Sequence, residues 1–138
     1  MTLLNHLPQN LKQRLQQKAL LKVISGLSNF DKISVEKVSR AASFGGADLI
    51  DLACDPELVK LSLKVSNIPV CVSAVDPKLF PPAVEAGASI IEIGNFDSFY
   101  PKGRFFSAQE VFDLALQTRK LLKQVCLSVT VPHILSLD

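Results

Sequence analysis

The chain has 138 residues, of which 48% are hydrophobic and 20% are charged, a length that suits one domain with a substantial buried core. Its formal net charge is only +2, and Lys and Arg are scattered, so neither a nucleic acid nor a membrane surface is indicated as a partner. No apolar run approaches the ~18 residues of a spanning helix, and the N-terminus lacks the features of a secretory signal.

The predicted elements alternate between helix and strand. Leucines at helical spacing predict an amphipathic lead-in helix within residues 1–19. Further helices are expected to start at Ser34, at Asp55-Pro56, at Asp76-Pro77 and at the capping box Ser107-x-x-Glu110. Between them lie apolar segments of strand length, at residues 20–25, 47–53, 68–74, 89–94 and 125–131. Pro132 opens one more element, which runs to Asp138.

An internal repeat supports this order. Residues 41–53 (AASFGGADLIDLA) match residues 82–94 (PAVEAGASIIEIG) at an offset of 41. In each copy a helix ends at Gly, Ala follows, and a strand carries one acidic residue among branched apolar ones. Such strand–helix alternation predicts a parallel sheet with right-handed crossovers.

Residue parity along the strands distinguishes two parallel folds. A flavodoxin-like open sheet has helices on both faces, so its strands are apolar almost throughout. In a barrel only one face meets helices, and the other lines the interior. Here one parity is apolar on every strand, whereas the other is marked by Lys22, Asp51, Ser73, Glu92 and Ser128. The sequence therefore predicts the first five βα units of a TIM-type (β/α)8 barrel, as one partial domain over residues 1–138.

Five units cannot close an eight-stranded cylinder. We therefore expect a truncated chain, or a half-barrel completed by a second copy or by a complementing C-terminal half. Alone, such a fragment would leave strand edges unpaired and is expected to be inactive.

The inward-facing charges are the first candidates for chemistry. Burying an unpaired charge costs several kcal/mol, so Lys22, Asp51 and Glu92 need partners, water or a ligand. Alternate strands contribute to one interior layer, and the repeat places Asp51 and Glu92 at equivalent heights. As catalytic groups, the carboxylates would transfer protons and Lys22 would act as an electrophile or a Schiff-base amine. The alternative is an internal ion-pair network that only fills the barrel.

Smaller polar residues follow the same face toward the mouth, which is the end of the barrel formed by the carboxyl ends of the strands. Ser73, Ser128 and Thr130 would line the upper interior, either binding ligand hydroxyls or simply fitting a narrow space. His133 directly follows the last strand and is either a mouth residue or an ordinary loop residue. The segment 95–106 (NFDSFYPKGRFF) holds five of the nine aromatic residues, and is expected to be a lid, or a loop packed on the rim or on a partner.

Other site signals are missing from the sequence. Cys54, Cys71 and Cys126 are too far apart for a C-x-x-C pair, and we expect reduced, mostly buried thiols in an intracellular protein. No metal-ligand cluster or glycine-rich phosphate loop is present, and no cofactor is indicated. Phosphate sites of barrels frequently come from the loops after strands seven and eight. The absence of a glycine-rich phosphate loop from the first five units is therefore uninformative.

Five motifs resemble the family called hypothetical chloroplast reading frame twenty-three, which is encoded in algal plastid genomes and has relatives encoded in cyanobacteria and in plant nuclear genomes. They are LKVISGLSNFD (21–31), DLACDPELVK (51–60), PVCVSAVDP (69–77), EIGNFDSFYPKG (92–103) and LSVTVPH (127–133). The resemblance implies an aldolase-type barrel without an assigned reaction, with about three further strands. It also implies a plastid stroma or a cyanobacterial cytoplasm. Its motifs fall at strand ends, which adds Ser25 and Asn95 to the ligand-binding candidates.

Two functions are open at this stage. In the complete protein, the barrel would be a lyase, isomerase or epimerase acting on a small phosphorylated metabolite, with Asp51 and Glu92 transferring protons and Lys22 polarising a carbonyl. Alternatively it would be a non-catalytic metabolite sensor or assembly barrel that uses the aromatic segment as its contact surface.

Overall fold

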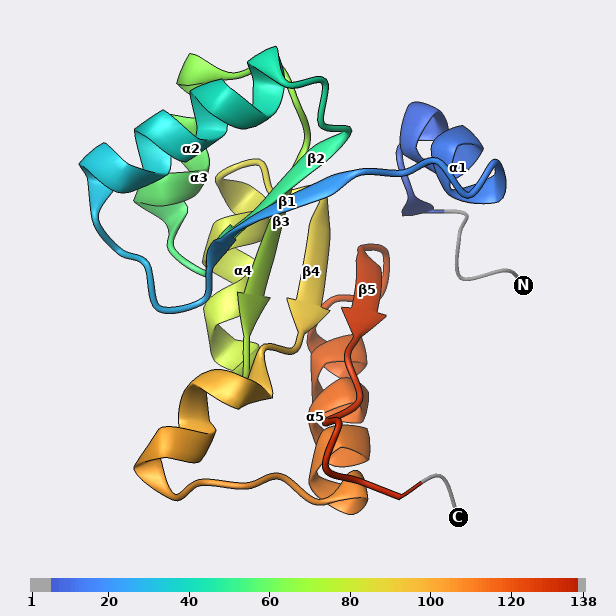
Figure 1. Cartoon of the computed structure of the whole chain (residues 1–138). Helices are drawn as coiled ribbons and strands as arrows, with labels where there is room; N and C mark the ends of the chain where they lie inside the picture. Colours follow the sequence, from blue (N-terminus) through green and yellow to red (C-terminus); the bar gives the residue numbers. More distant parts are fainter. Residues whose placement is uncertain (1–5, 137–138) are drawn as a thin grey trace.

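The computed structural model describes residues 6–136 and contains one sheet of five parallel strands (Figure 1). The strands are β1 (Lys22–Gly26), β2 (Leu49–Ala53), β3 (Val70–Ala74), β4 (Ile90–Ile93) and β5 (Cys126–Val129). Their order in the sheet is their order in the chain, and every neighbouring pair is parallel.

This strand order separates the two predicted folds. A sheet that winds in one direction through right-handed crossovers keeps its connecting helices on one face, whereas a flavodoxin-like sheet reverses its order and has helices on both faces. The chain is therefore an α/β protein with the winding of a barrel, as predicted. The described strands form an unclosed part of that barrel, in which β1 and β5 are the edges.

The connecting helices begin with clear capping residues. The helices are α1 (Gln9–Gln16), α2 (Lys32–Phe44), α3 (Pro56–Val65), α4 (Phe80–Glu85) and α5 (Ala108–Leu121), with the 3-10 turns η2 (Pro77–Leu79) and η3 (Phe96–Lys102). The predicted starts at Asp55, Asp76 and Ser107 are confirmed. The predicted start at Ser34 is wrong, because the Asp31 side chain accepts hydrogen bonds from Ile33 N and Ser34 N and the helix begins at Lys32.

Apolar residues pack in two layers, one on each face of the sheet. The outer layer lies between the sheet and α2–α5, and its strand residues are almost fully covered. The inner layer is smaller and joins Leu11 of α1 to Leu49, Cys71 and Ile90. In Figure 1, α1 lies beside the amino ends of the strands, apart from the other helices. It therefore covers the interior face at the amino ends of the strands.

The lead-in helix is shorter than predicted, because only Gln9–Gln16 is helical and residues 1–5, including Leu4, lie outside the described residues. The three cysteines are free thiols, with Cys54 and Cys71 buried, as expected. Within residues 6–136, no helix has the length and apolar character required to cross a membrane.

The aromatic segment has more structure than a plain loop. It contains η3, which lies beyond the carboxyl ends of β3 and β4 in Figure 1. Left-handed residues stand at both ends of η3, Asn95 with φ 59° and Gly103 with φ 73°. After Pro132 the described chain forms a turn, in which Leu135 N donates to Pro132 O.

Candidate functional site

Three charged side chains meet on the interior face of the sheet. Lys22 Nζ on β1 lies 2.9 Å from Glu92 Oε2 on β4 and 3.4 Å from Asp51 Oδ2 on β2. The Asp51 side chain is 1% exposed, that of Glu92 9% and that of Lys22 26%. The structure thus brings together the three residues that parity analysis selected, and we call them the interior triad.

Barrel geometry explains why residues from three strands meet. Asp51 pairs with Cys71, and Cys71 pairs with Ile90, so Glu92 stands two positions beyond the direct partner of Asp51. In an eight-stranded barrel with a shear of eight, one layer advances by about one residue per strand. Two strand-to-strand steps lead from β2 to β4, so Asp51 and Glu92 share a layer. Lys22 pairs with Leu49, which is nearer the amino end of β2 than Asp51. Its long side chain extends toward the carboxyl end and reaches both carboxylates.

Two serines hold the carboxylates in place. Ser73 Oγ lies 2.8 Å from both oxygens of Asp51, to which its hydroxyl donates. Ser128 Oγ donates to Glu92 Oε2 over 2.8 Å. Both partners of Glu92 therefore use Oε2, and within residues 6–136 no hydrogen bond engages Oε1. One oxygen of Glu92 is left available to a ligand.

Burial and charge act on the triad in opposite directions. Burial alone would lower the pKa of Lys22, but the hydrogen bond with Glu92 and the negative charge of Asp51 outweigh it, so the pKa is raised above 10.5. Burial raises the pKa of Asp51 above 3.8, although the hydrogen bond from Ser73 and the charge of Lys22 pull it down. Lys22 is therefore held as an ammonium group, and Asp51 retains a proton to higher pH than an exposed aspartate.

Sequence reasoning missed a fourth group at this place. One potential ligand atom each from Asp51, Cys71 and Glu92 lies within 4.8 Å of the others, a set that could hold a metal ion. However, the Lys22 ammonium already supplies positive charge here, and burial raises the pKa of Cys71 well above 9.0, so its thiol stays protonated. The sequence signal was that Cys71 lies on the inward face of its strand. Burial of Cys71 as an apolar residue explained that position equally well.

The mouth of the sheet next to β4 and β5 is tightly packed. A Cβ atom on Gly94 would lie 2.7 Å from Thr130 Oγ1 and 3.3 Å from Glu92 Cγ. Thr130 is thus beside the triad, where it was expected. Asn95 follows at once, and its side-chain Nδ2 is buried with no hydrogen-bond partner among residues 6–136.

Two predicted ligand-binding residues do not contact the interior triad. The Ser25 hydroxyl, near the end of β1, accepts from Asn29 Nδ2 over 3.0 Å, and the same amide donates to Ser34 Oγ. His133 Nδ1 lies 3.2 Å from Asp97 Oδ1, and its ring meets Tyr100 edge-on. Both His133 and Asp97 are largely exposed, and within residues 6–136 no hydrogen bond or ion pair joins either to the interior triad.

The aromatic segment packs largely on itself. Phe106 is buried against the rings of Phe96 and Phe99, and Tyr100 stacks on Phe105. Of its five aromatic side chains, Phe105 is the one that belongs to the large exposed apolar residues of residues 6–136. This packing favours the predicted rim loop over the predicted contact surface.

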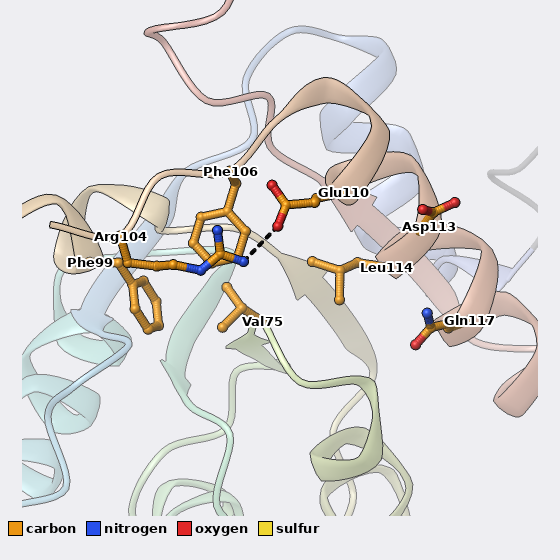
Figure 2. Close-up of a pocket in the computed structure, with 8 residues that line it drawn as sticks. All are labelled: Val75, Phe99, Arg104, Phe106, Glu110, Asp113, Leu114 and Gln117. Atoms are coloured by element: carbon orange, nitrogen blue, oxygen red, sulfur yellow. Dashed lines mark hydrogen bonds and ion pairs between the residues drawn. The ribbon is translucent and has the colours of Figure 1, made fainter. Parts of the chain in front are cut away.

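A cavity of about 460 Å³ lies on the outer side of this segment, against α5 (Figure 2). In the figure, Arg104 reaches across the Phe106 ring to Glu110, at 4.0 Å from the ring centroid and 2.7 Å from Oε1. Asp113 and Gln117 extend its wall along α5. None of the interior triad lines this cavity, so we place it outside the candidate site.

Three other cavities adjoin the triad or the mouth. One of about 290 Å³ is lined by Lys22, Glu92 and Ser128 together with residues of the inner apolar layer. One of about 200 Å³ contains Ser73 and Cys54, and one of about 520 Å³ contains Asn95. The latter two share Leu27 and Ser28 from the connection between β1 and α2. The candidate site is therefore the interior triad together with this mouth.

Comparison with known proteins gives strong relatives in algae. A protein of Cyanophora paradoxa named uncharacterized protein ycf23 is 51% identical over 125 residues, which cover 90% of this chain and 51% of the relative. Proteins of the same name from Antithamnion sp. and Pyropia yezoensis are 41% and 36% identical, over 88% and 94% of this chain. This chain spans about half the length of these curated relatives.

Two solved structures are similar at a coarser level. One is the 2-keto-3-deoxy-6-phosphogluconate aldolase of Zymomonas mobilis, at 15% identity and a TM-score of 0.44 over 82% of this chain and 70% of that one. The other is the dihydropteroate synthase of Xanthomonas albilineans, at 15% identity and a TM-score of 0.45 over 83% and 59%.

The model of the family described as protein of unknown function (DUF561) matches residues 5–138. The relatives' shared name agrees with the chloroplast reading-frame resemblance of the sequence motifs. The chain therefore belongs to the DUF561 family.

Proposed function

We propose that the complete protein is an enzyme that moves a proton beside the carbonyl group of a small metabolite, as lyases, isomerases and epimerases of such compounds do. The observation that supports this most is the interior triad, in which one ammonium group meets two carboxylates of different environment, and Lys22 and Glu92 line a cavity. Pairs of acids whose environments differ often divide the acid and base roles between them.

In this proposal, Glu92 Oε1 accepts a proton from the carbon next to the carbonyl. The electron pair moves onto the carbonyl oxygen, where the Lys22 ammonium stabilises the negative charge. Asp51, whose pKa burial raises, returns a proton to the intermediate. The steps end with Glu92 protonated and Asp51 ionised; Glu92 then loses its proton to solvent and Asp51 takes one up, so the cycle closes without an oxidant or reductant.

The charge of Lys22 favours an electrophile over a Schiff-base amine. A Schiff base forms from a neutral amine, and amines that form one are usually activated by a lowered pKa. Here the hydrogen bond with Glu92 and the charge of Asp51 raise the pKa of Lys22 despite its burial. Lys22 is therefore better suited to stabilising negative charge than to attacking a carbonyl.

Deuterium exchange provides the test, because proton removal beside a carbonyl introduces solvent deuterium whichever product follows. This chain and the Cyanophora paradoxa relative are incubated in D₂O with hydroxy-aldehydes and hydroxy-ketones, each with and without a phosphate ester, and followed by proton NMR. We expect exchange on at least one compound. Glu92→Gln should lower the rate by about 10²-fold or more, as for a lost general base.

The control variant is Glu57→Gln, which removes an exposed carboxylate of α3 that pairs with Lys60. It should leave exchange unchanged. The proposal would be wrong if neither protein exchanged any compound, or if Glu92→Gln exchanged as fast as the unmodified chain. Binding without exchange would point instead to the non-catalytic metabolite sensor.

Partners and location belong to the same proposal. We place the working protein in a plastid stroma or a cyanobacterial cytoplasm. We also propose that the edges β1 and β5 are paired there, by a complementing half or by a second copy. Light scattering should show this chain to be associated in solution, because Ile24 of β1 and Val129 of β5 are exposed on these edge strands. A well-behaved monomer would contradict the pairing.

A further inference from the structure

We infer that the mouth of these five strands receives an uncharged, hydroxylated end of the substrate and binds no phosphate group. This inference extends the proposed function, on which it rests only for identifying the bound molecule as a substrate. A phosphate carried by that substrate would then be held by residues outside the described chain.

The helix starts around the mouth are the first reason. Helix N-termini at the carboxyl end of a parallel sheet are natural phosphate sites, because their first N–H groups lack partners. Here the chain's own carboxylates occupy them. Asp31 accepts from Ile33 N and Ser34 N, each over 3.2 Å, and Asp55 accepts from Glu57 N and Leu58 N over 2.8 and 3.0 Å.

The remaining two starts are occupied in the same way. Asp76 accepts from Lys78 N over 3.0 Å. Ser107 accepts from Glu110 N over 3.2 Å, and Glu110 accepts from Ser107 N over 2.8 Å. A phosphate at any of the four starts would have to displace a side chain that is already hydrogen-bonded, in three cases a carboxylate of like charge.

Charge at the mouth is the second reason. In the described part of the chain, Lys22 is the one cation among the residues that line the three cavities near the triad, and it already contacts two carboxylates. Glu92, Asp76 and Asp97 line the same cavities. A phosphate group of charge about −1.5 to −2 would meet net negative charge.

A cationic ligand is not favoured either, because each of these carboxylates already has a partner, and the free oxygen of Glu92 belongs to a carboxylate that is paired with Lys22. Glu92 contacts Lys22, Asp97 contacts His133, and Asp76 caps η2. What remains at the mouth are neutral groups that exchange hydrogen bonds with hydroxyls and carbonyls. They are the hydroxyl of Ser28, which lines two cavities, the buried amide Nδ2 of Asn95, which has no partner, and the exposed Thr130.

Asn95 carries the strongest signal in this group. A buried donor without a partner is unfavourable, and within residues 6–136 no hydrogen bond uses Asn95 Nδ2. Rotation of the amide about its last side-chain bond would turn either Nδ2 or Oδ1 toward the cavity that Asn95 lines. A ligand hydroxyl can pair with either atom, since it both donates and accepts.

The test is an NMR titration of the full chain with three probes at equal concentration: dihydroxyacetone, inorganic phosphate and ethylammonium. We expect dihydroxyacetone to shift the backbone amides of residues 27–29, 73–76 and 94–98, and its affinity to be insensitive to salt. Phosphate and ethylammonium should leave these amides unmoved. The inference is overturned if phosphate or ethylammonium shifts them more than dihydroxyacetone, or if no probe shifts them.

Two variants separate a ligand contact from a backbone role. Asn95→Gly removes the amide while glycine adopts the left-handed conformation more easily, so it should bind dihydroxyacetone roughly three- to tenfold more weakly without losing thermal stability. Ser28→Ala, at an exposed position, should weaken binding similarly. Ser43→Ala on α2 is the control and should bind normally. Unchanged affinity in both Asn95→Gly and Ser28→Ala would overturn the inference.

Failure of this inference and failure of the proposed function have different signatures. Dihydroxyacetone that binds at the mouth without deuterium exchange in any compound supports the inference and removes the proposed enzyme. If a compound undergoes deuterium exchange but phosphate shifts the amides at the mouth more than dihydroxyacetone does, the proposed enzyme is supported and this inference is overturned.

Discussion

At the scale of single residues, the interior triad sets the balance of charge. Asp51 and Glu92 are nearly inaccessible, and Lys22 is their shared cation. Removing one partner of a buried ion pair leaves an uncompensated charge, which commonly costs about 3–5 kcal/mol. The structure therefore makes Lys22 a requirement of the fold as well as of the proposed reaction.

We predict that Lys22→Met lowers the free energy of unfolding by roughly 3 kcal/mol near neutral pH. Burial already raises the folded-state pKa of Asp51, so its ionisation costs stability as the pH rises through that pKa. Without Lys22, one influence that lowers this pKa is lost. The deficit should thus be small at about pH 4 and grow toward about pH 8, as measured by urea unfolding.

The matched control is Lys60→Met, which removes the exposed partner of Glu57. Exposed pairs contribute little, and its loss should stay within about 0.5 kcal/mol at either pH. Equal deficits for Lys22→Met and Lys60→Met would mean that the triad is not buried as described.

Gly94 is the second residue with a specific requirement. We predict that Gly94→Ala destabilises the chain by about 1–3 kcal/mol, because the new Cβ would lie 2.7 Å from Thr130 Oγ1 and 3.1 Å from Thr130 Cβ. In a Thr130→Gly background this clash disappears, so the same alanine should cost much less in thermal unfolding. An equal cost in both backgrounds would place the origin of the strain elsewhere.

At the scale of elements, the start of α5 shows how one helix end depends on pH. The hydrogen bond from Arg104, together with those from Ser107, lowers the pKa of Glu110 to about 2 from 4.5. A carboxyl whose folded pKa is depressed stabilises the fold above its unfolded pKa, and this contribution is lost as the pH falls toward the folded pKa.

We predict that Glu110→Gln lowers the melting temperature at about pH 6, and that the difference from the unmodified chain disappears as the pH falls from about 4.5 toward about 2. Arg104→Gln should remove most of this pH dependence, since Arg104 is the main cause of the lowered pKa. A difference that is constant across this range would contradict the capping account.

The same scale shows what sequence can and cannot specify about an element. Asp-Pro and Ser-x-x-Glu signals located three helix starts, because the capping hydrogen bonds are local. Ser34 was mistaken for the start of α2 because Asp31, three residues earlier, caps equally well. The η3 turn and the left-handed Asn95 left no periodic pattern, since they depend on how aromatic side chains of the segment pack.

At the scale of the whole molecule, a periodicity of two was enough to choose the barrel and to predict the interior face. Lys22, Asp51 and Glu92 were chosen from parity and lie together, with Ser73 and Ser128 beside them. Parity fixes the face of a strand and not the path of the chain beyond it. For that reason parity did not predict the partners of Ser25 and His133, which are Asn29 and Asp97 and not the interior triad.

The central claim is that side chains from β1 and β4, 70 residues apart in the chain, interact on one interior face. A double-mutant cycle measures this interaction directly. Chemical unfolding of Lys22→Met, Glu92→Gln and the double variant should give a coupling free energy of about 1–3 kcal/mol. A cycle of Lys22→Met with Glu57→Gln should be additive. Additivity within about 0.5 kcal/mol between Lys22 and Glu92 would contradict the shared interior and the function proposed for it.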